Sequence, residues 1–319
     1  MPYKSICLLG GSGFVGKNIA SQLAAKGYHV HILTRHKSHC HDLRVLPNLK
    51  ISEVDIHDQN QLNVATANTD VVINLVGILN ERQHNGDGFH RAHVELTQKV
   101  LNACRHNKIP RLLHMSALNA DASQGSSYYL RTKGEAEDMV HSFSDEIATT
   151  CFRPSVIFGT EDNFFNRFAS ILKLSPYAFP LACAQARFSP IYVKEVAQFF
   201  VDAINNNASF GKRIDLCGPE IFSLKELVTL TSQQIGRKHW IISLPDIISK
   251  LQAMVLEYIP GKPFSIDNYN SLQTDSICRH HQLYTAKVSL KSIIPGYLGR
   301  NNKFYKDDQF RQQSRRNLQ

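Results

Sequence analysis

A glycine-rich turn near the N-terminus, GGSGFVG at residues 10–16, constrains the fold more than any other stretch of the sequence. It follows an apolar run at residues 6–9 and precedes a helical stretch at residues 13–26. In that setting Gly10 allows a tight turn, Gly13 lets a pyrophosphate approach the backbone, and Gly16 allows close packing of helix on sheet. The motif therefore predicts a dinucleotide-binding turn at the first strand-to-helix crossover, with a purely structural glycine turn as the alternative.

The first helical turn after these glycines is expected to supply the phosphate contacts. Unpaired N–H groups and the helix dipole favour an anion at a helix N-terminus. The donors we expect there are the backbone amides of Ser12, Gly13, Phe14 and Val15.

Short apolar or β-branched runs alternate with amphipathic stretches through the first half of the chain. The predicted strands are residues 4–9, 30–34, 50–54, 71–76, 111–116, 148–153 and 213–217. The predicted helices of that half are residues 13–26, 60–67, 89–107 and 132–143. Alternation with crossovers of this length predicts an α/β fold, a doubly wound parallel Rossmann sheet.

The pattern loosens after residue 153, which suggests a second domain. We expect a Rossmann domain over residues 1–217, with 155–190 contributing to the substrate side, and a smaller, mostly helical C-terminal substrate domain over 218–299. Residues 176–187 look like a loop. Residues 300–319 hold six Lys or Arg against two Asp and are predicted to form a basic, flexible tail.

Composition bears on the expected cellular location of the protein. The chain has 319 residues, a net charge of +9 and no apolar run long enough to span a bilayer. Nothing resembling a targeting peptide precedes the first strand, and seven scattered cysteines without a CxxC pair favour reduced thiols. We therefore expect a cytoplasmic location, with peripheral contact at the inner face of the cell membrane as the alternative.

Nucleic acid is not an expected partner, because the sequence has no zinc-finger spacing and no basic stretch interleaved with aromatic residues. A metal is not expected either. The His36, His39, Cys40 and His41 cluster matches no closed tetrahedral spacing. The apolar stretch at 244–259 is expected to face its own domain, or else a membrane or partner; together with the basic tail it is the candidate contact with a membrane or respiratory complex.

The end of the second predicted strand indicates which nicotinamide cofactor would bind. An NAD(H) site usually places an acid there to hold the ribose 2′-hydroxyl. Here Arg35 and Lys37 stand in that position, and the first acid afterwards is Asp42. Because a guanidinium and an ammonium suit a 2′-phosphate, we predict NADP(H) over NAD(H).

A serine, a tyrosine and a lysine form a candidate catalytic trio. Tyr129 and Lys133 are four residues apart, so they share one face of a helix, and Ser116 ends the fifth strand. Lys133 is expected to hold the nicotinamide ribose hydroxyls, and its charge to favour ionisation of the phenol, which would make Tyr129 a general acid or base near neutral pH. The alternative is that the trio holds cofactor without turnover.

The sequence resembles the extended and atypical branches of the short-chain dehydrogenase/reductase superfamily. The resemblance rests on the GxxGxxG and YxxxK motifs and on three stretches, HMSALNADASQGSSYYLRTKGEAED, RPSVIFGTEDNFFNRFASIL and FSPIYVKEVA. They are similar to a subgroup of epimerase/dehydratase-like proteins that contains the NADPH-binding accessory subunit of respiratory complex I and bacterial single-chain relatives.

That resemblance implies further cofactor residues, and the sequence departs from the family pattern at one position. It implies that Asp55 and Ile56 lie beside the adenine, that Leu75, Val76 and Gly77 flank the ribose, and that Pro154 and Ser155 line the nicotinamide end. His93 stands where many extended members carry Asn.

Three functions remain open from the sequence alone. The first is an oxidoreductase or epimerase acting on an unidentified small carbonyl or quinone-like substrate. The second is a non-catalytic, NADPH-holding accessory or assembly protein of a respiratory membrane complex. The third is an NADPH-sensing regulator.

Overall fold

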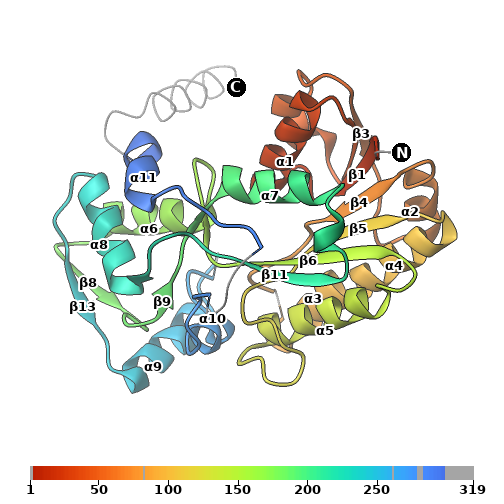
Figure 1. Cartoon of the computed structure of the whole chain (residues 1–319). Helices are drawn as coiled ribbons and strands as arrows, with labels where there is room; N and C mark the ends of the chain where they lie inside the picture. The colour runs from red at the N-terminus through yellow and green to blue at the C-terminus, as the bar shows by residue number, and fades with distance from the viewer. Residues whose placement is uncertain (1–2, 82, 261, 279–282, 299–319) are drawn as a thin grey trace, which may run out of the picture.

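The computed structural model describes residues 3–81, 83–260, 262–278 and 283–298. Its centre is a seven-stranded, wholly parallel sheet in the order β11-β6-β5-β4-β1-β2-β3 (Figure 1). The strands are β1 Ser5–Leu9, β2 His29–Thr34, β3 Leu49–Glu53, β4 Val71–Asn74, β5 Arg111–Met115, β6 Ala148–Pro154 and β11 Lys212–Leu216. Each predicted strand is found within two residues of its expected bounds, and the Rossmann prediction is confirmed.

Helices cover both faces of this sheet. One face carries α1 Phe14–Ala25 and α7 Val193–Ala203, which pack on each other and share one apolar core with the sheet. The other face carries α2 Gln59–Ala65, α4 Leu96–His106 and α5 Tyr128–Ser142 around a second core. A short helix, α3 Asp87–His90, and a π turn at Arg91–Glu95 lead into α4. The chain order reverses between β1 and β4, which is where ligands bind in open α/β sheets.

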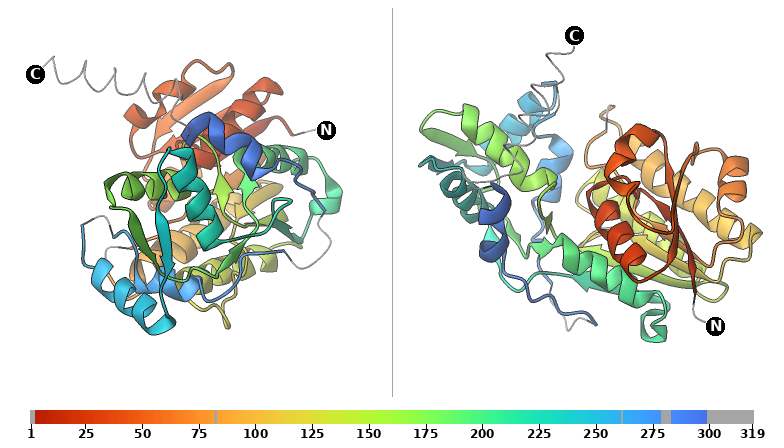
Figure 2. Two further views of the ribbon diagram at one scale, coloured as in Figure 1. Left: turned by 90° about the vertical axis from the view of Figure 1, so that its left-hand side faces the viewer. Right: turned by 90° about the horizontal axis from the view of Figure 1, so that it is seen from above.

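A second lobe lies beyond the carboxyl ends of the strands (Figure 2). Its core, distinct from the two sheet cores, is built from residues between Phe158 and Leu298. Its helices are α6 Asn163–Leu174, α8 Leu224–Gln234, α9 Asp246–Leu256, α10 Ile266–Ser271 and α11 Leu290–Leu298. Three small sheets accompany them: β7 Ile157–Phe158 with β10 Ile191–Tyr192, β9 Arg187–Phe188 with β12 Phe222–Ser223, and β8 Ala178–Leu181 with β13 Trp240–Ser243.

The segment at residues 176–187 differs from the loop that the sequence suggested. It holds β8 and the first residue of β9. Strand β8 pairs in parallel with β13, in a register that sets Trp240 opposite Ala178 and Ile242 opposite Pro180. Because the partner strand lies some sixty residues away in the chain, no local pattern around Pro180 signals this pairing.

Cys217 and Cys278 form a disulfide, with their Cα atoms 6.0 Å apart. This differs from the expectation of reduced thiols throughout. The pair forms because residues 272–278 return from the second lobe alongside β9, where Ser276 N donates to Arg187 O and Ser189 N donates to Ser276 O. The other five cysteines are free thiols, four of them buried.

Replacing Cys278 by serine is expected to lower the free energy of unfolding by about 2 to 4 kcal/mol, because the disulfide closes a long loop in the unfolded chain. Urea unfolding followed by circular dichroism measures the difference. Cys183→Ser, at a half-buried free thiol, is the control. Equal stability of the wild type with and without dithiothreitol would contradict the prediction.

None of the helices within the described residues is long and apolar enough to cross a membrane. The predicted basic tail, residues 300–319, lies outside the described residues.

Candidate functional site

The glycine turn has the backbone geometry of a phosphate-binding crossover. Gly10 has φ of +79°, a left-handed conformation that favours glycine. A Cβ on Gly16 would lie 2.3 Å from the carbonyl oxygen of Gly10, and one on Gly13 would lie 3.3 Å from the same atom. Gly16 is therefore required for the close approach of α1 to the turn.

The N-terminus of α1 is left open for an anion. Gly13 is its N-cap residue and supplies no side-chain hydrogen bond, and the first turn holds no acidic residue. The amides of the first turn, including Phe14 and Val15, are thus available as donors at the positive end of the helix dipole. These observations fit the pyrophosphate of a dinucleotide.

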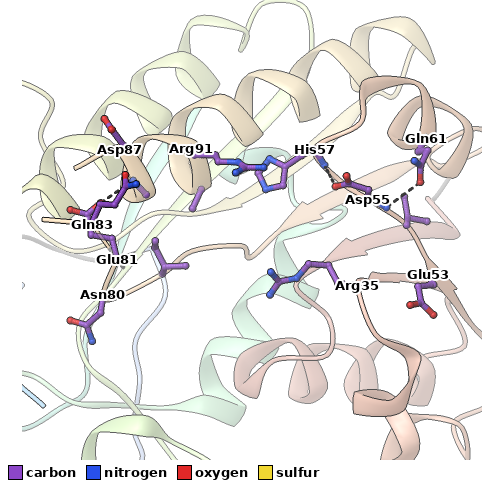
Figure 3. Close-up of a pocket in the computed structure, with 14 residues that line it drawn as sticks. Arg35, Glu53, Asp55, His57, Gln61, Asn80, Glu81, Gln83, Asp87 and Arg91 are labelled. Carbon is purple, nitrogen blue, oxygen red and sulfur yellow. Dashed lines mark hydrogen bonds between the residues drawn. The ribbon is translucent and has the colours of Figure 1, made fainter. Parts of the chain in front are cut away.

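A cavity of about 1040 Å³ extends from the ends of β2 and β3 to the loop after β4 and the start of the π turn (Figure 3). Two of the predicted cofactor residues, Arg35 and Asp55, line it. Asp55 is held by the chain that follows, since its Oδ1 accepts from His57 N at 2.9 Å and its own N–H donates to Gln61 Oε1 at 3.1 Å. Ile56 is buried beneath them.

Charged groups of both signs line this cavity, two arginines and four acids: Arg35, Arg91, Glu53, Asp55, Glu81 and Asp87. Figure 3 shows Arg35 and Arg91 reaching into it from opposite sides, with His57 beside Arg91, whereas the carboxylate of Glu53 points away from Arg35. Burial, followed by the charge of Arg91, lowers the pKa of His57. Lys37 is exposed in the short 3₁₀ segment Lys37–Leu43 that follows β2.

Sequence reasoning missed His57 and Arg91. His57 directly follows the Asp55-Ile56 pair, so its place next to the adenine end could have been noted. Arg91 gave no signal, because a helical stretch does not show which of its side chains faces a cavity.

The loop after β4 lies between the glycine turn and α5, the helix that carries Tyr129 and Lys133. A Cβ on Gly10 would lie 3.3 Å from backbone atoms of Leu75 and Val76. Val76 N donates to Asn74 Oδ1 at 3.1 Å, which fixes the start of the loop. A Cβ on Gly77 would lie 2.8 Å from Lys133 Nζ, so a glycine there leaves room for the lysine head group.

Ser116 lies at the end of β5, and Lys133 contacts the carbonyl of the residue before it. Ser116 N donates to Phe152 O at 2.8 Å, and its buried hydroxyl has no hydrogen-bond partner within the described part of the chain. Lys133 Nζ donates to Met115 O at 3.0 Å, and burial lowers the pKa of this lysine to about 8. A buried, unpartnered hydroxyl beside a buried ammonium is costly unless a ligand completes the site.

The phenol of Tyr129 differs from the sequence expectation. Its ring packs edge-on against Phe89 and His93, at centroid distances of 6.1 and 5.6 Å. Burial, and then the charge of Asp267, raises the pKa of Tyr129 to about 12. The expected lowering by Lys133 is absent, so Tyr129 is a neutral hydroxyl at physiological pH and suits the role of proton donor.

His93, at the position of the noted departure, is buried on the π turn. Its Nε2 accepts a hydrogen bond from Ile78 N at 3.1 Å, so Nδ1 carries the proton and donates to Thr132 Oγ1 at 2.9 Å. Burial and the charge of Lys133 lower the pKa of His93 to about 2. The neutral imidazole of His93 thus links the loop after Gly77 to α5.

Asp267 of α10, in the second lobe, caps the N-terminus of α5. Its carboxylate accepts from Tyr128 N at 2.7 Å and from Tyr129 N at 3.3 Å. Because the contact joins segments 138 residues apart, no local sequence pattern indicates it. The orientation of Tyr129 therefore depends on the second lobe.

Pro154 and Ser155 lie at the end of β6, next to this site. Pro154 O accepts from Leu118 N at 3.0 Å. Ser155 Oγ donates to Ser276 O at 2.7 Å, so this hydroxyl holds the returning strand. Among the described residues, no cluster of three or more His, Cys, Asp or Glu has metal-site geometry.

Lys133→Met is expected to stabilise the unliganded protein by about 2 kcal/mol at pH 7, because the folded state keeps a buried charge there. The pKa of this lysine is lowered on folding, so the unfolded chain binds more protons between about pH 8 and 10.5. Wild-type stability therefore rises with pH through that window, and the advantage of the variant disappears. Thermal unfolding at pH 7 and pH 10.5 measures this, with exposed Lys225→Met as control. An equal effect of both substitutions at pH 7 would contradict it.

Comparison with known proteins places this site in a family. Residues 6–217 match the NAD dependent epimerase/dehydratase family. The chain therefore belongs to that family, whose fold is that of NAD(P)-binding oxidoreductases and epimerases.

Two relatives and one solved structure illustrate the range of that family. The chain is 29% identical over 294 residues, 86% of this chain and 71% of the other, to "NADH dehydrogenase [ubiquinone] 1 alpha subcomplex subunit 9, mitochondrial" from Arabidopsis thaliana. It is 30% identical over 172 residues, 49% of this chain and 51% of the other, to "4-hydroxy-2-methyl-3-oxo-4-farnesyl-3,4-dihydroquinoline-1-oxide ketoreductase" from Stigmatella aurantiaca. The UDP-glucuronic acid 4-epimerase from Bacillus cereus, solved with UDP-glucuronic acid and NAD, superposes with a TM-score of 0.70 at 18% identity, covering 92% of this chain and 97% of that one.

Proposed function

We propose that this protein is an NADP(H)-dependent oxidoreductase that reduces a small carbonyl or quinone-like compound. The observation that carries the proposal is the buried, unpartnered Ser116 hydroxyl at the end of β5, beside the ammonium of Lys133. When bound, the reduced cofactor supplies a hydride at that point. The chain supplies the rest: Ser116 donates a hydrogen bond to the substrate oxygen, and Tyr129 delivers a proton to it.

The choice of NADP(H) rests on the adenine end of the cavity. Arg35 and Arg91 face each other across it, and Lys37 stands exposed close by. A ribose 2′-phosphate would find a planar guanidinium there, in the position where an NAD(H) site has an acid. The epimerase neighbour named above was solved with NAD, and the proposal of NADP(H) is supported only by this chain's own residues.

The test is oxidation of NADPH by the purified protein with a panel of aldehydes, ketones and quinones. Turnover that exceeds a no-protein control for at least one compound is the expected result. A complete absence of turnover across the panel, with NADPH bound, would overturn the enzymatic proposal.

The second candidate is an accessory protein that holds NADPH without turnover and assembles with a respiratory membrane complex. It is favoured by the plant relative, whose name places it in NADH dehydrogenase. Here NADPH binding would persist in Tyr129→Phe, which removes only the hydroxyl, and partner capture would depend on cofactor occupancy. Equal capture of a respiratory complex with and without NADPH would count against this role.

A further inference from the structure

The helix α9, Asp246–Leu256, turns its large apolar side chains away from the core of the second lobe. Its buried residues are Ser249 and Ala253, which are small. Its large apolar side chains point outward instead, and Ile247 is 83% exposed. The exposed apolar residues of this segment are Ile247, Ile248, Leu251, Met254, Val255, Tyr258 and Ile259.

This orientation is fixed by contacts on the inner side. Cys183 N donates to Ser249 Oγ at 3.4 Å, Gln252 Nε2 donates to Pro180 O at 3.3 Å, and the Tyr269 hydroxyl donates to Asp246 at 2.7 Å. With 3.6 residues per turn, positions 247, 251, 254, 255 and 258 fall within an arc of about 120° opposite Ser249 and Ala253. The described residues bury none of this arc, and Figure 1 shows α9 at the outer end of the second lobe.

The apolar surface continues onto the neighbouring strand pair. Trp240 at the start of β13 is 75% exposed, and its backbone N–H donates to Tyr177 O at 2.7 Å. Leu174, Tyr177 and Ile242 are exposed as well. We call residues 174–177 and 240–259 together the outer apolar surface. It holds eleven of the seventeen exposed large hydrophobic residues that the described chain carries.

Basic and aromatic residues border this surface. Lys250 is exposed on the flank of α9, and the exposed Arg237 and Lys238 stand three and two residues before Trp240. Exposed tryptophan and tyrosine next to lysine and arginine, beside an apolar helix face, are the features of a helix that lies in a membrane interface. The cations fit anionic lipid head groups, whereas the apolar arc fits the start of the acyl region.

Other occupants fit less well. A stable dimer buries about 800 Å² on each copy, and α9 by itself, about 16 Å long, offers too little of that; across a symmetric pair the basic residues that border the surface would also face like charges. Residues 299–319 of the same chain carry six Lys or Arg and lack an apolar pattern that could cover the arc. We propose that the outer apolar surface docks the protein on an anionic phospholipid bilayer, with α9 lying in the plane of the interface.

Co-sedimentation of the full chain with vesicles tests this directly. The protein is expected to pellet with vesicles of phosphatidylglycerol and phosphatidylcholine, and less with phosphatidylcholine alone or at high salt. The triple variant I247S/L251S/V255S should partition on the order of 100-fold more weakly. A matched control, V64S/I221S/L283S, removes exposed apolar side chains elsewhere and should bind as the wild type does.

Trp240 gives a second readout, because it is the sole tryptophan of the chain. Its emission should shift to the blue when anionic vesicles are added to the wild type. Wild-type protein that stays in the supernatant with both vesicle types overturns the proposal. So does a lipid-free dimer, seen by sedimentation velocity, that the triple variant converts to a monomer, since that result assigns the surface to a second copy. Binding should be unchanged in Tyr129→Phe, which separates this proposal from the enzymatic one.

Discussion

Replacing Tyr129 by phenylalanine should lower the rate of NADPH-dependent carbonyl reduction by about 10²- to 10⁴-fold. The substitution removes the hydroxyl that delivers a proton and keeps the ring that packs against Phe89 and His93. Because burial raises the pKa of Tyr129 to about 12, the group is a neutral proton donor throughout the physiological range. NADPH affinity should stay unchanged, since the glycine turn and Arg35 are untouched.

Steady-state kinetics with the best substrate of the panel, together with fluorescence titration of NADPH, measures both effects. Tyr128→Phe is the matched control, because this neighbouring tyrosine is 43% exposed and begins the same helix. Equal rates for the wild type and Tyr129→Phe would remove the tyrosine from the chemistry. A parallel loss of NADPH affinity would show instead that the substitution disturbs the cofactor site.

The central sheet could be predicted because its strands are buried on both faces. Ile6, Leu8, Val71 and Leu113 belong to short continuous apolar runs, which is the pattern of strands in a parallel sheet. These runs alternate with helices along the chain, so neighbouring parts of the chain carry the signal. The β8–β13 pair lacks this property, because its two strands are joined only by the packing of the second lobe.

Within the site, too, features set by neighbouring residues could be predicted, and features set by tertiary packing could not. The glycine turn and the Tyr129–Lys133 pair are set by local spacing along one helix or turn. Asp267 reaches α5 from the second lobe, and Arg91 reaches the cavity from the turn before α4, so both depend on tertiary packing. The pKa of Tyr129 belongs to the second group, because burial outweighs the charge that its sequence neighbour provides.

Helix α9 shows that sequence periodicity does not determine which side of a helix faces the core. The apolar periodicity at 244–259 predicts an amphipathic helix whose apolar side faces its own domain, and the direction in that prediction is wrong. Periodicity measures a direction around the helix axis, and only tertiary contacts decide whether that direction is inward. Here Ser249 and Ala253 take the inner side, so the apolar residues meet solvent.

Arg35→Glu should invert the cofactor preference. A hydrogen bond from a guanidinium to a charged group contributes about 1.5 to 3 kcal/mol, so its loss alone weakens NADPH binding by about 10- to 100-fold. The new carboxylate repels the 2′-phosphate and can accept from the ribose 2′-hydroxyl of NADH, as acids at the end of the second strand do. We expect weaker NADPH binding together with equal or tighter NADH binding.

Titration calorimetry with both cofactors, at low and high salt, measures the ratio of the two dissociation constants. Arg44→Glu is the control, because it changes the net charge equally at an exposed position outside the residues that line the cavity. The wild-type preference should also weaken with salt, since an exposed arginine is screened. A ratio that Arg35→Glu leaves at the wild-type value would place the 2′-phosphate elsewhere, and Arg91 would then be the residue to change, because its side chain reaches the same cavity from the opposite wall.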